Sequence, residues 1–383
     1  MAVGTAGGLL DSPKSTSVFK HEILRQYSKA FLAKVASKSD GHRVMVLDGF
    51  AGRGRFDDGT PGSAELFMQA AADLAGVSTA IRLFERNAVD ADRLATVASE
   101  YVQRGVDVAV ERADISTRLE ETVAAAAGIP LFLFLDPCGQ NLPFDLVVKV
   151  LRDVRGGTWP PTEALLNLSA DFTRRIGGVL NKGLDTAGLL SMDRMMGGDW
   201  WREVVLEAHD DTRDGSWGPA ADAVARQYVQ RLSDAAKMDH VLVPVRRRPD
   251  NQPTYHLAYL TRSPHGQWVM ADALAKARQV WLRDVGPQED DTQQSLFELD
   301  PVGEMILSEQ ETAMRRAKLR LQGLAARELK FSLLDHVLVA FGDDYGVLTE
   351  SNLGKVMAEL VKDGKVVRDP GQRLAKAIYT YKG

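Results

Sequence analysis

The chain has 383 residues, of which 45% are hydrophobic and 26% charged, and its net charge is −5. That length predicts two or three domains. No apolar run approaches the roughly 18 residues of a membrane span. No basic segment precedes the short apolar patch near the N-terminus, so no secretory signal is predicted and the expected location is the cytoplasm. The single cysteine, Cys138, excludes an internal disulfide. The seven histidines show no ligand spacing, so no metal is expected.

The predicted elements begin with an amphipathic helix over residues 18–32, where apolar residues recur at helical spacing. Five short β-rich runs follow, separated by helical stretches: 43–48, 80–85, 106–111, 130–136 and 164–168. Almost wholly apolar strands that alternate with helices indicate a parallel sheet buried on both faces. Ligands of such sheets bind at the carboxyl ends of the strands. The first, second and fourth runs each end there in an acidic residue.

A helical segment and a hairpin are predicted next. Residues of about 171–237 are polar at helical spacing, with methionines and tryptophans clustered among them, and are expected to form an insertion. Two β-rich runs, 240–247 and 255–261, flank the turn sequence RRPDNQP and predict an antiparallel hairpin. We therefore expect an α/β domain over 15–283, whose parallel sheet ends in this hairpin.

The remaining residues predict a linker and a small domain. Residues 284–300 are acidic and rich in turn formers, which is typical of a linker. Helical patterns at 308–324, 331–341 and 350–362 precede two short β-rich runs, 365–368 and 377–381. This order is the outline of a winged helix over 301–383. Thr349 is a candidate cap of the last helix, with Ser351 as the competing choice.

The segment DGFAGRG, which starts at Asp48, carries the most information about a ligand. Glycines let the backbone approach a ligand closely and adopt positive φ. A glycine-rich turn after the first strand is where a Rossmann-like sheet receives its cofactor. The spacing is neither the G-x-G-x-x-G of a dinucleotide site nor the G-K-[ST] of a P-loop. An adenosine-bearing ligand other than NAD or ATP is therefore favoured.

The run VLDGFAGRGRF resembles the first motif of the amino-group DNA methyltransferases, VLDPFAGSGTT, with Gly49 in place of the proline. The resemblance implies a Rossmann-like class I methyltransferase sheet and S-adenosylmethionine as cofactor. It places the methionine part of the cofactor beside Asp48, Gly49, Phe50, Ala51, Gly52 and Gly54. Glu85 stands where such enzymes hold the ribose hydroxyls, and a carboxylate can accept hydrogen bonds from both. Asp114 matches the position that contacts the adenine amino group.

The segment DPCG, at the end of the fourth predicted strand, is similar to the [DN]-P-P-[YF] motif of the same enzymes. There the acidic or amide side chain and a backbone carbonyl accept hydrogen bonds from the target amino group, and the aromatic ring stacks on an extruded base. Asp136 and Pro137 match the first half of the motif. Cys138 and Gly139 depart from the second half, which removes the stacking ring. Asp136, Pro137 and Cys138 are the predicted catalytic segment.

Two further resemblances concern the whole first half of the chain. The segments FKHEIL, AGRGRF and LDPCGQ are similar to a bacterial 23S ribosomal RNA adenine-N6 methyltransferase. Residues 15–180 resemble more closely the family called three-Cys-motif partner protein, which shows K-x-x-I-L-x-x-Y, DGFAGxG, a Gly-Ser pair and DPxG. Some members carry a winged-helix tail. The family is named for a protein with three cysteines, which is therefore a candidate partner.

Candidate substrate contacts come from three parts of the chain. The resemblance implies that Lys20, in the first helix, reaches the mouth of the site. Asn167 lies at the end of the fifth strand, and Asp171, Arg174 and Arg175 follow it. Of these, Arg174 and Arg175 are predicted to bind substrate, while Asp171 is expected to cap a helix. Further basic residues that could contact phosphate lie at the hairpin and in the winged helix: Arg246, Arg247, Arg248, Lys355, Lys362, Lys365, Arg368, Arg373 and Lys376.

The leading hypothesis is a methyltransferase that modifies an exocyclic amino group of DNA or RNA, with adenine N6 favoured. The first alternative is a non-catalytic subunit that binds a protein partner or nucleic acid, because the aromatic residue after Pro137 is missing. A second alternative is cytosine-C5 methylation with Cys138 as nucleophile. That nucleophile needs a lowered pKa or a nearby base, and no ENV-type acidic partner is present in the sequence.

Overall fold

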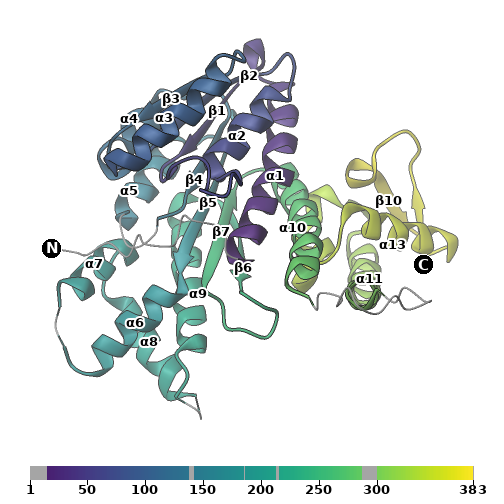
Figure 1. Cartoon of the computed structure of the whole chain (residues 1–383). Helices are drawn as coiled ribbons and strands as arrows, with labels where there is room; N and C mark the ends of the chain where they lie inside the picture. Colours follow the sequence, from purple (N-terminus) through teal and green to yellow (C-terminus); the bar gives the residue numbers. More distant parts are fainter. Residues whose placement is uncertain (1–14, 138–141, 185, 213–214, 287–299, 383) are drawn as a thin grey trace, which may run out of the picture. The chain divides into compact units, whose positions relative to one another are not determined.

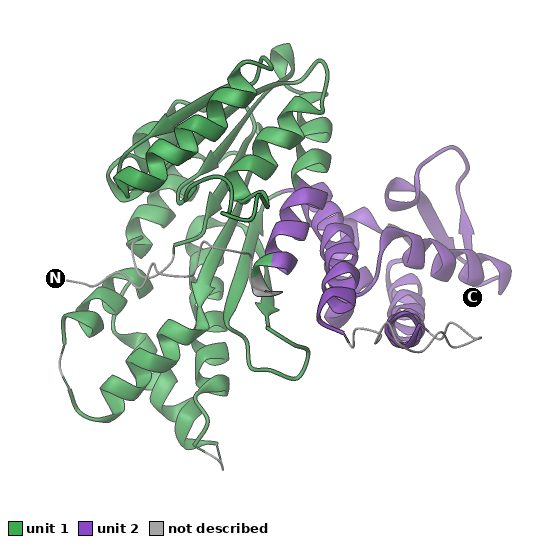
Figure 2. Ribbon diagram, viewed as in Figure 1, with its two compact units in different colours: residues 1–17, 28–262 green, residues 18–27, 263–383 purple. Residues whose placement is uncertain are grey.

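A computed structural model describes residues 15–137, 142–184, 186–212, 215–286 and 300–382. The chain divides into two compact units (Figure 2). The sheet unit comprises residues 1–17 and 28–262, and the C-terminal unit comprises residues 18–27 and 263–383. Helix α1 (Ser15–Ala36) therefore contributes residues to both units.

Seven strands form one sheet in the sheet unit (Figure 1): β1 Arg43–Asp48, β2 Ser78–Phe84, β3 Asp107–Glu111, β4 Leu131–Leu135, β5 Thr162–Ser169, β6 Asp239–Val245 and β7 Tyr255–Thr261. Their order across the sheet is β3-β2-β1-β4-β5-β7-β6. Strands β1 to β5 pair in parallel, while β7 is antiparallel to both of its neighbours. This is the order of the Rossmann-like methyltransferase sheet, so the predicted α/β class and its sheet are confirmed.

Burial explains why these segments form strands. All residues of β4 and β7 are buried, and in β1 only the first residue is exposed. Such strands have both faces covered, which is why their sequences are nearly continuous apolar runs. The predicted strands agree with the observed ones to within two residues at each end.

Four helices connect the parallel strands: α2 Ser63–Ala72, α3 Ala88–Val102, α4 Leu119–Ala124 and α5 Phe144–Lys149. Helix α3 begins at Asn87, whose side chain accepts hydrogen bonds from the N–H groups of Val89 and Asp90. An Asn cap of this kind satisfies backbone donors that have no partner within the helix. It fixes the point at which the chain leaves the carboxyl end of β2.

The predicted insertion consists of four helices between β5 and β6: α6 Ala170–Asn181, α7 Ala187–Met196, α8 Trp200–Asp210 and α9 Gly218–Ala236. Met192 and Trp201 are wholly buried in it. The indole N–H of Trp201 donates to Asp193 Oδ1 at 2.9 Å. The methionines and tryptophans noted in the sequence therefore hold the insertion together.

The amino edge of the parallel strands contains a buried arginine, Arg155. Its guanidinium donates to Thr162 Oγ1 at 2.8 Å, to the Ala126 carbonyl at 2.6 Å and to the Ile129 carbonyl at 2.7 Å. Burial lowers the pKa of Arg155. Nearby, Arg262 donates to four backbone carbonyls, including that of Arg155 at 3.0 Å. Both cations thus tie the ends of strands and helices together.

Glu163, the second residue of β5, is also buried near this edge. The hydroxyl groups of Tyr259 and Thr261, on the neighbouring strand β7, are its hydrogen-bond partners. Burial raises the pKa of Glu163 to about 8, although both hydrogen bonds oppose that change. The carboxyl group is therefore protonated in part at neutral pH.

The C-terminal unit contains helices α10 Pro264–Val285, α11 Pro301–Glu328, α12 Val337–Phe341 and α13 Glu350–Lys362, and strands β8 Lys330–Ser332, β9 Val366–Arg368 and β10 Ile378–Tyr381. The strands form an antiparallel sheet in the order β8-β10-β9. From α11 onward, this is the order of elements in a winged helix. Thr349 rather than Ser351 caps α13, in a reciprocal pair with Asn352.

Two expectations about this unit are corrected. The helix expected over 331–341 is confined to α12 and a preceding turn, because Phe331 and Ser332 pair with β10 instead. The expected boundary near residue 283 lies instead at Arg262, because α10 belongs to the C-terminal unit. Trp268 of α10 packs in that unit's core and donates its indole N–H to Glu350 at 3.0 Å.

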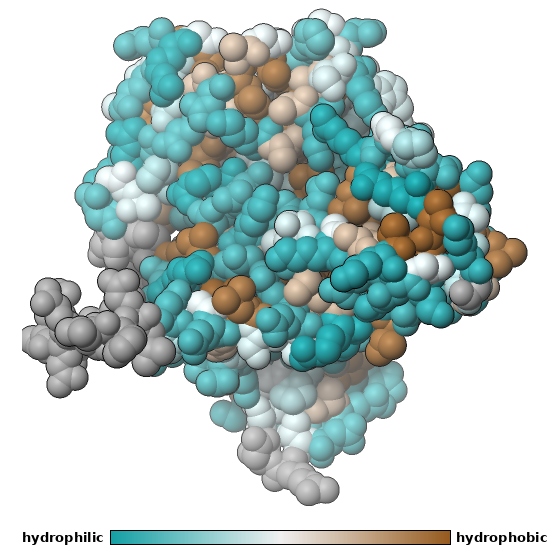
Figure 3. All heavy atoms as spheres, turned by 90° about the vertical axis from the view of Figure 1, so that its right-hand side faces the viewer, coloured by the Kyte–Doolittle hydropathy of each residue, from teal (hydrophilic) through white to brown (hydrophobic). Residues whose placement is uncertain are grey.

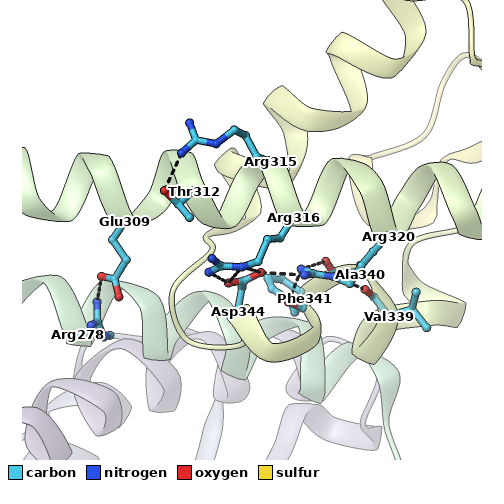
Figure 4. A network of polar contacts seen from close by, with 10 residues as sticks. All are labelled: Arg278, Glu309, Thr312, Arg315, Arg316, Arg320, Val339, Ala340, Phe341 and Asp344. Atoms are coloured by element: carbon cyan, nitrogen blue, oxygen red, sulfur yellow. Dashed lines mark hydrogen bonds and ion pairs between the residues drawn. The ribbon is translucent and has the colours of Figure 1, made fainter.

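A buried carboxylate, Asp344, joins α11 to the turn after α12 (Figure 4). Arg316 forms an ion pair with it, and Arg320 donates to its Oδ2 at 2.9 Å. Arg320 also donates to the Phe341 carbonyl at 2.7 Å. The hydrogen bond and the charge of Asp344 raise the pKa of Arg316. These contacts fix α11 and α12 against each other.

The surface combines hydrophilic side chains with scattered apolar ones, as the face in Figure 3 shows. In the C-terminal unit, the exposed apolar side chains include Leu307, Leu319 and Leu329. Among the described residues, none of the helices is both long and apolar enough to cross a membrane.

Candidate functional site

Asp48, the last residue of β1, holds the glycine-rich loop in place. Its side chain is 0% exposed. One carboxylate oxygen accepts the Phe50 N–H at 3.0 Å, and the other accepts the Ser63 hydroxyl at 2.7 Å. Since the group is enclosed and bonded on both oxygens, its contribution to the predicted site is to shape the loop.

The glycines of this loop are required for different reasons. Gly52 and Gly54 have φ of +58° and +80°, which side chains rarely adopt. Gly49 has no room for a side chain, because a Cβ there would lie 2.8 Å from Leu135 Cδ2. At Gly52, by contrast, a Cβ would meet nothing within 4 Å. Open space beside a backbone N–H is what a bound ligand requires at this position.

Glu85 follows β2 and bonds to the same loop. One of its carboxylate oxygens accepts the Gly52 N–H at 3.1 Å, and the other accepts the Asn87 N–H at 2.6 Å. A carboxylate has about four acceptor positions, so two remain. The half-buried Glu85 thus fixes the glycine turn and retains acceptors for a diol.

Asp114 follows β3 and is 34% exposed. Its Oδ1 accepts the Ser116 N–H at 2.9 Å, and its other oxygen lies 3.6 Å from the guanidinium of Arg86. It therefore starts a short helical turn and keeps one oxygen accessible. It follows the strand that pairs with β2, the strand before Glu85.

Asp136, directly after β4, is bonded to Asn167 of β5. Asn167 Nδ2 donates to Asp136 Oδ1 at 2.5 Å. Asn167 Oδ1 is buried and has no hydrogen-bond partner in the part of the chain that the structure describes. Pairing of β4 with β5 brings the two residues together, because Leu135 and Leu166 are in register. Asn167 was only a general candidate in the sequence, since strand order is not visible there.

The second half of the DPCG segment, Cys138 and Gly139, lies outside the described residues. Pro137 is half-buried. The predicted nucleophilic role of Cys138 therefore stays a prediction.

The predicted substrate contacts are distributed over both units. Lys20 is half-buried in the part of α1 that belongs to the C-terminal unit. Arg174 donates to the Pro253 carbonyl at 2.8 Å and forms an ion pair with Asp171. Arg175 is exposed and lies over the Phe172 ring, 5.0 Å from its centre.

The cap of α6 corrects the expectation for Asp171. Ser169 is the N-cap, and its hydroxyl accepts the Phe172 N–H at 3.1 Å. Asp171 lies in the first turn of the helix, where a negative charge is also favourable.

No cluster of three or more His, Cys, Asp or Glu side chains suited to a metal ion occurs among the described residues. The site therefore consists of a glycine-rich loop, two accessible strand-end carboxylates and the Asp136–Asn167 pair. These groups can hold a ligand rich in hydroxyl and amino groups.

No family model and no curated protein matches this chain. Several solved structures resemble it at low identity. A Legionella pneumophila protein of the family model DUF519 is 12% identical, with a TM-score of 0.36 over 65% of this chain and 85% of that one. A putative rRNA-methylase from Clostridium thermocellum is 8% identical, with a TM-score of 0.28 over 57% and 87%. M. jannaschii TYW2 in complex with AdoMet is 9% identical, with a TM-score of 0.29 over 62% and 75%. Likeness at this level identifies neither activity nor ligand.

Proposed function

We propose that this chain transfers a methyl group from S-adenosylmethionine to an exocyclic amino group of a nucleic acid, with adenine N6 favoured. One observation carries the proposal. The glycine loop, Glu85 and Asp136 follow β1, β2 and β4, and Asn167 lies near the carboxyl end of β5; these four strands are parallel and adjacent. A cofactor loop and an acceptor pair thus meet at the edge where such sheets bind ligands.

The residues present fit the proposed cofactor. Gly52 offers open space beside its backbone, and Glu85 retains two acceptor positions for ribose hydroxyls. Asp114 keeps an accessible oxygen for an amino group. When bound, S-adenosylmethionine supplies a methyl group already activated by its sulfonium charge.

The role proposed for Asp136 is to orient the amine. Its carboxylate accepts a hydrogen bond from the target amino group and so directs the nitrogen lone pair toward the methyl carbon. The bond from Asn167 Nδ2 fixes the plane of the carboxylate. Because the methyl donor is activated, orientation of this kind supplies much of the catalysis and no strong base is needed.

The cofactor is tested by isothermal titration with S-adenosylmethionine and S-adenosylhomocysteine. We expect micromolar binding by the wild type, and its loss in Gly52→Val and Glu85→Ala. Gly59→Val and Glu111→Ala are matched controls: Gly59 lies in the same loop with φ of +86° and open space, and Glu111 ends the next strand. The absence of binding by a folded wild type would contradict the proposal.

A second candidate is a non-catalytic subunit that binds nucleic acid or a partner protein, such as one with the three-cysteine motif. It is favoured by the sequence Pro137-Cys138-Gly139, which lacks the stacking ring of amino-group methyltransferases. Transfer of labelled methyl from S-adenosylmethionine to total RNA or DNA distinguishes the two. If Cys138→Ser alone abolished transfer while cofactor binding persisted, cytosine-C5 chemistry would replace the adenine assignment.

A further inference from the structure

Four arginines of the sheet unit gather around the β6–β7 loop. Arg246, Arg247 and Arg248 follow β6, and Arg226 lies on α9. Arg226, Arg247 and Arg248 are exposed, and Arg246 is half-buried. None of the four forms an ion pair with a residue that the structure describes. We call these four residues the arginine rim.

Asp222, whose carboxylate interacts electrostatically with two members of the rim, is also paired with His256. His256 Nε2 lies 2.9 Å from Asp222 Oδ1. Burial opposes ionisation of Asp222, but the hydrogen bond from His256 and the charges of Arg226 and Arg246 hold its pKa below the ordinary value. Arg226 and Arg246 therefore both lie within electrostatic range of Asp222. The loop also contains one acid of its own, Asp250, against three arginines.

Strand register places the rim at the carboxyl edge of the sheet. Tyr255 of β7 pairs with Val245 on one side and with Ser169, the last residue of β5, on the other. The N–H groups of Ala170 and Asp171 both donate to the Thr254 carbonyl at 3.1 Å. The β6–β7 loop thus leaves the sheet where β5 enters α6, as Figure 1 also shows. Asn167 is two residues before that point.

The loop has a defined shape. Arg246 donates to the Asn251 carbonyl at 2.6 Å, and Arg174 of α6 donates to the Pro253 carbonyl at 2.8 Å. The chain from Arg246 to Pro253 is therefore tied at both ends. Because the backbone of this loop is already ordered, binding a ligand to its guanidinium groups costs less conformational entropy than it would on a free tail.

The arginines beside the glycine loop form ion pairs, unlike those of the rim. Arg53 pairs with Asp57 and Asp90, and Arg55 pairs with Glu65 and Glu100. In the C-terminal unit, Lys318 forms ion pairs with Glu359 and Asp363, so its positive charge is compensated as well. The positive charge of the rim is not compensated in this way.

We infer that the arginine rim binds the sugar–phosphate backbone of a nucleic acid and presents it to the Asp136–Asn167 pair. Guanidinium groups match phosphate oxygens with two parallel hydrogen bonds. Contacts of this kind set the position of the polymer without selecting its sequence. The inference rests on the proposed function for the reaction that follows binding, but binding itself is measured independently of it.

The test is fluorescence anisotropy with labelled single-stranded RNA, single-stranded DNA and duplex DNA of about 30 nucleotides, at several salt concentrations. The variant Arg247→Ala/Arg248→Ala removes two charges from the rim. Arg315→Ala/Arg327→Ala removes two charges from exposed positions of α11, and is the matched control. We expect the rim variant to bind at least about 10-fold more weakly, with a salt slope lower by about 1.4 to 1.8, because each phosphate contact contributes about 0.7 to 0.9. The control is expected to bind like the wild type.

Circular dichroism first establishes that the variants are folded, so that each outcome tests whether the arginine rim binds nucleic acid. Equal affinity of wild type and rim variant, equal weakening by the control, or no binding of any probe by the wild type would overturn the inference. Titration with S-adenosylmethionine on the same samples separates the two proposals. If the rim binds nucleic acid but the protein does not bind S-adenosylmethionine, the methyltransferase assignment is contradicted and the inference about the rim stands. The preferred probe reports whether the substrate is RNA or DNA.

Discussion

Arg155 and Arg247 lie at opposite edges of the same sheet and have opposite surroundings. Arg155, at the amino edge, is buried and directs each guanidinium nitrogen to an acceptor of the fold. Arg247, at the carboxyl edge, is exposed and has no ion pair with the described residues. The same contrast separates Glu163, bonded to two hydroxyls, from Asn167, whose Oδ1 has no partner among those residues.

This contrast distinguishes residues that stabilise the fold from residues that are available to bind a ligand. A buried polar group with its partners stabilises the fold, whereas one without partners carries a desolvation cost that a ligand can remove. We therefore expect substitutions at the amino edge to change the free energy of unfolding and leave ligand binding alone. Substitutions at the carboxyl edge should do the reverse.

The largest effect is expected at the carboxyl edge, for Asp136→Ala. Loss of the acceptor should reduce methyl transfer by about 100- to 1,000-fold, up to about 4 kcal/mol of transition-state stabilisation. The affinity for S-adenosylmethionine, measured by titration calorimetry, and the thermal midpoint should stay near wild type. A parallel loss of cofactor affinity would contradict the role assigned to Asp136.

Asn167→Asp sharpens this prediction through pH. Two carboxyl groups at the 2.5 Å separation of the present pair cannot both ionise readily, so one has a raised pKa. While the introduced group is protonated, it can donate to Asp136 as the amide does. Transfer should therefore be close to wild type in mild acid and fall at least about 10-fold as the pH rises through that pKa. Asn167→Ala should be impaired at every pH; an Asn167→Asp profile parallel to wild type would show that the contact is only structural.

At the amino edge, Arg155→Ala should cost about 3 to 4 kcal/mol of unfolding free energy, because it leaves buried acceptors unsatisfied and opens a cavity. Urea denaturation measures this value. Binding of S-adenosylmethionine by the folded fraction should not change. Arg152→Ala is a suitable control, because Arg152 is exposed and pairs with the exposed Asp153. A loss of cofactor affinity without loss of stability in Arg155→Ala would break the division between the edges.

Glu163→Gln should have a smaller effect that depends on pH. The pKa of Glu163 is raised to about 8, so between the ordinary value of 4.5 and about 8 the folded state binds more protons than the unfolded state. Stability contributed by this group is therefore lost as the pH rises. The loss between pH 5 and pH 8 is about 3 kcal/mol. Thermal melts should show that Glu163→Gln removes this part of the decline; an identical decline in the variant would contradict it.

The sequence predicted the sheet because long-range order follows from simple rules. Apolar runs indicated strands buried on both faces, and their alternation with helices indicated parallel pairing. Acidic residues at the ends of several strands were therefore expected at one edge. The structure agrees for Asp48, Glu85 and Asp136.

Other parts of the site depended on contacts between distant segments. That Asp48 is enclosed and shapes the loop follows from its bond to Ser63, which the sequence does not reveal. That Asn167 holds Asp136 follows from the adjacency of β4 and β5. The affiliation of α10 follows from the packing of Trp268, whereas composition had indicated a boundary at the acidic segment.

Helix α1 has a consequence for how this architecture can be inherited. Residues 18–27 belong to the C-terminal unit although 235 residues of the sheet unit, 28–262, separate them from the rest of it. Phe19 packs on Trp281 with ring centres 5.7 Å apart, and Ile23 and Leu24 are wholly buried. If a gene fusion or a premature stop ended the chain at residue 262, the apolar side chains of residues 18–27 would lose the residues that they pack against. The C-terminal unit therefore cannot be transferred to another protein as residues 263–383 alone. Recombination that transfers it must include residues 18–27 as well.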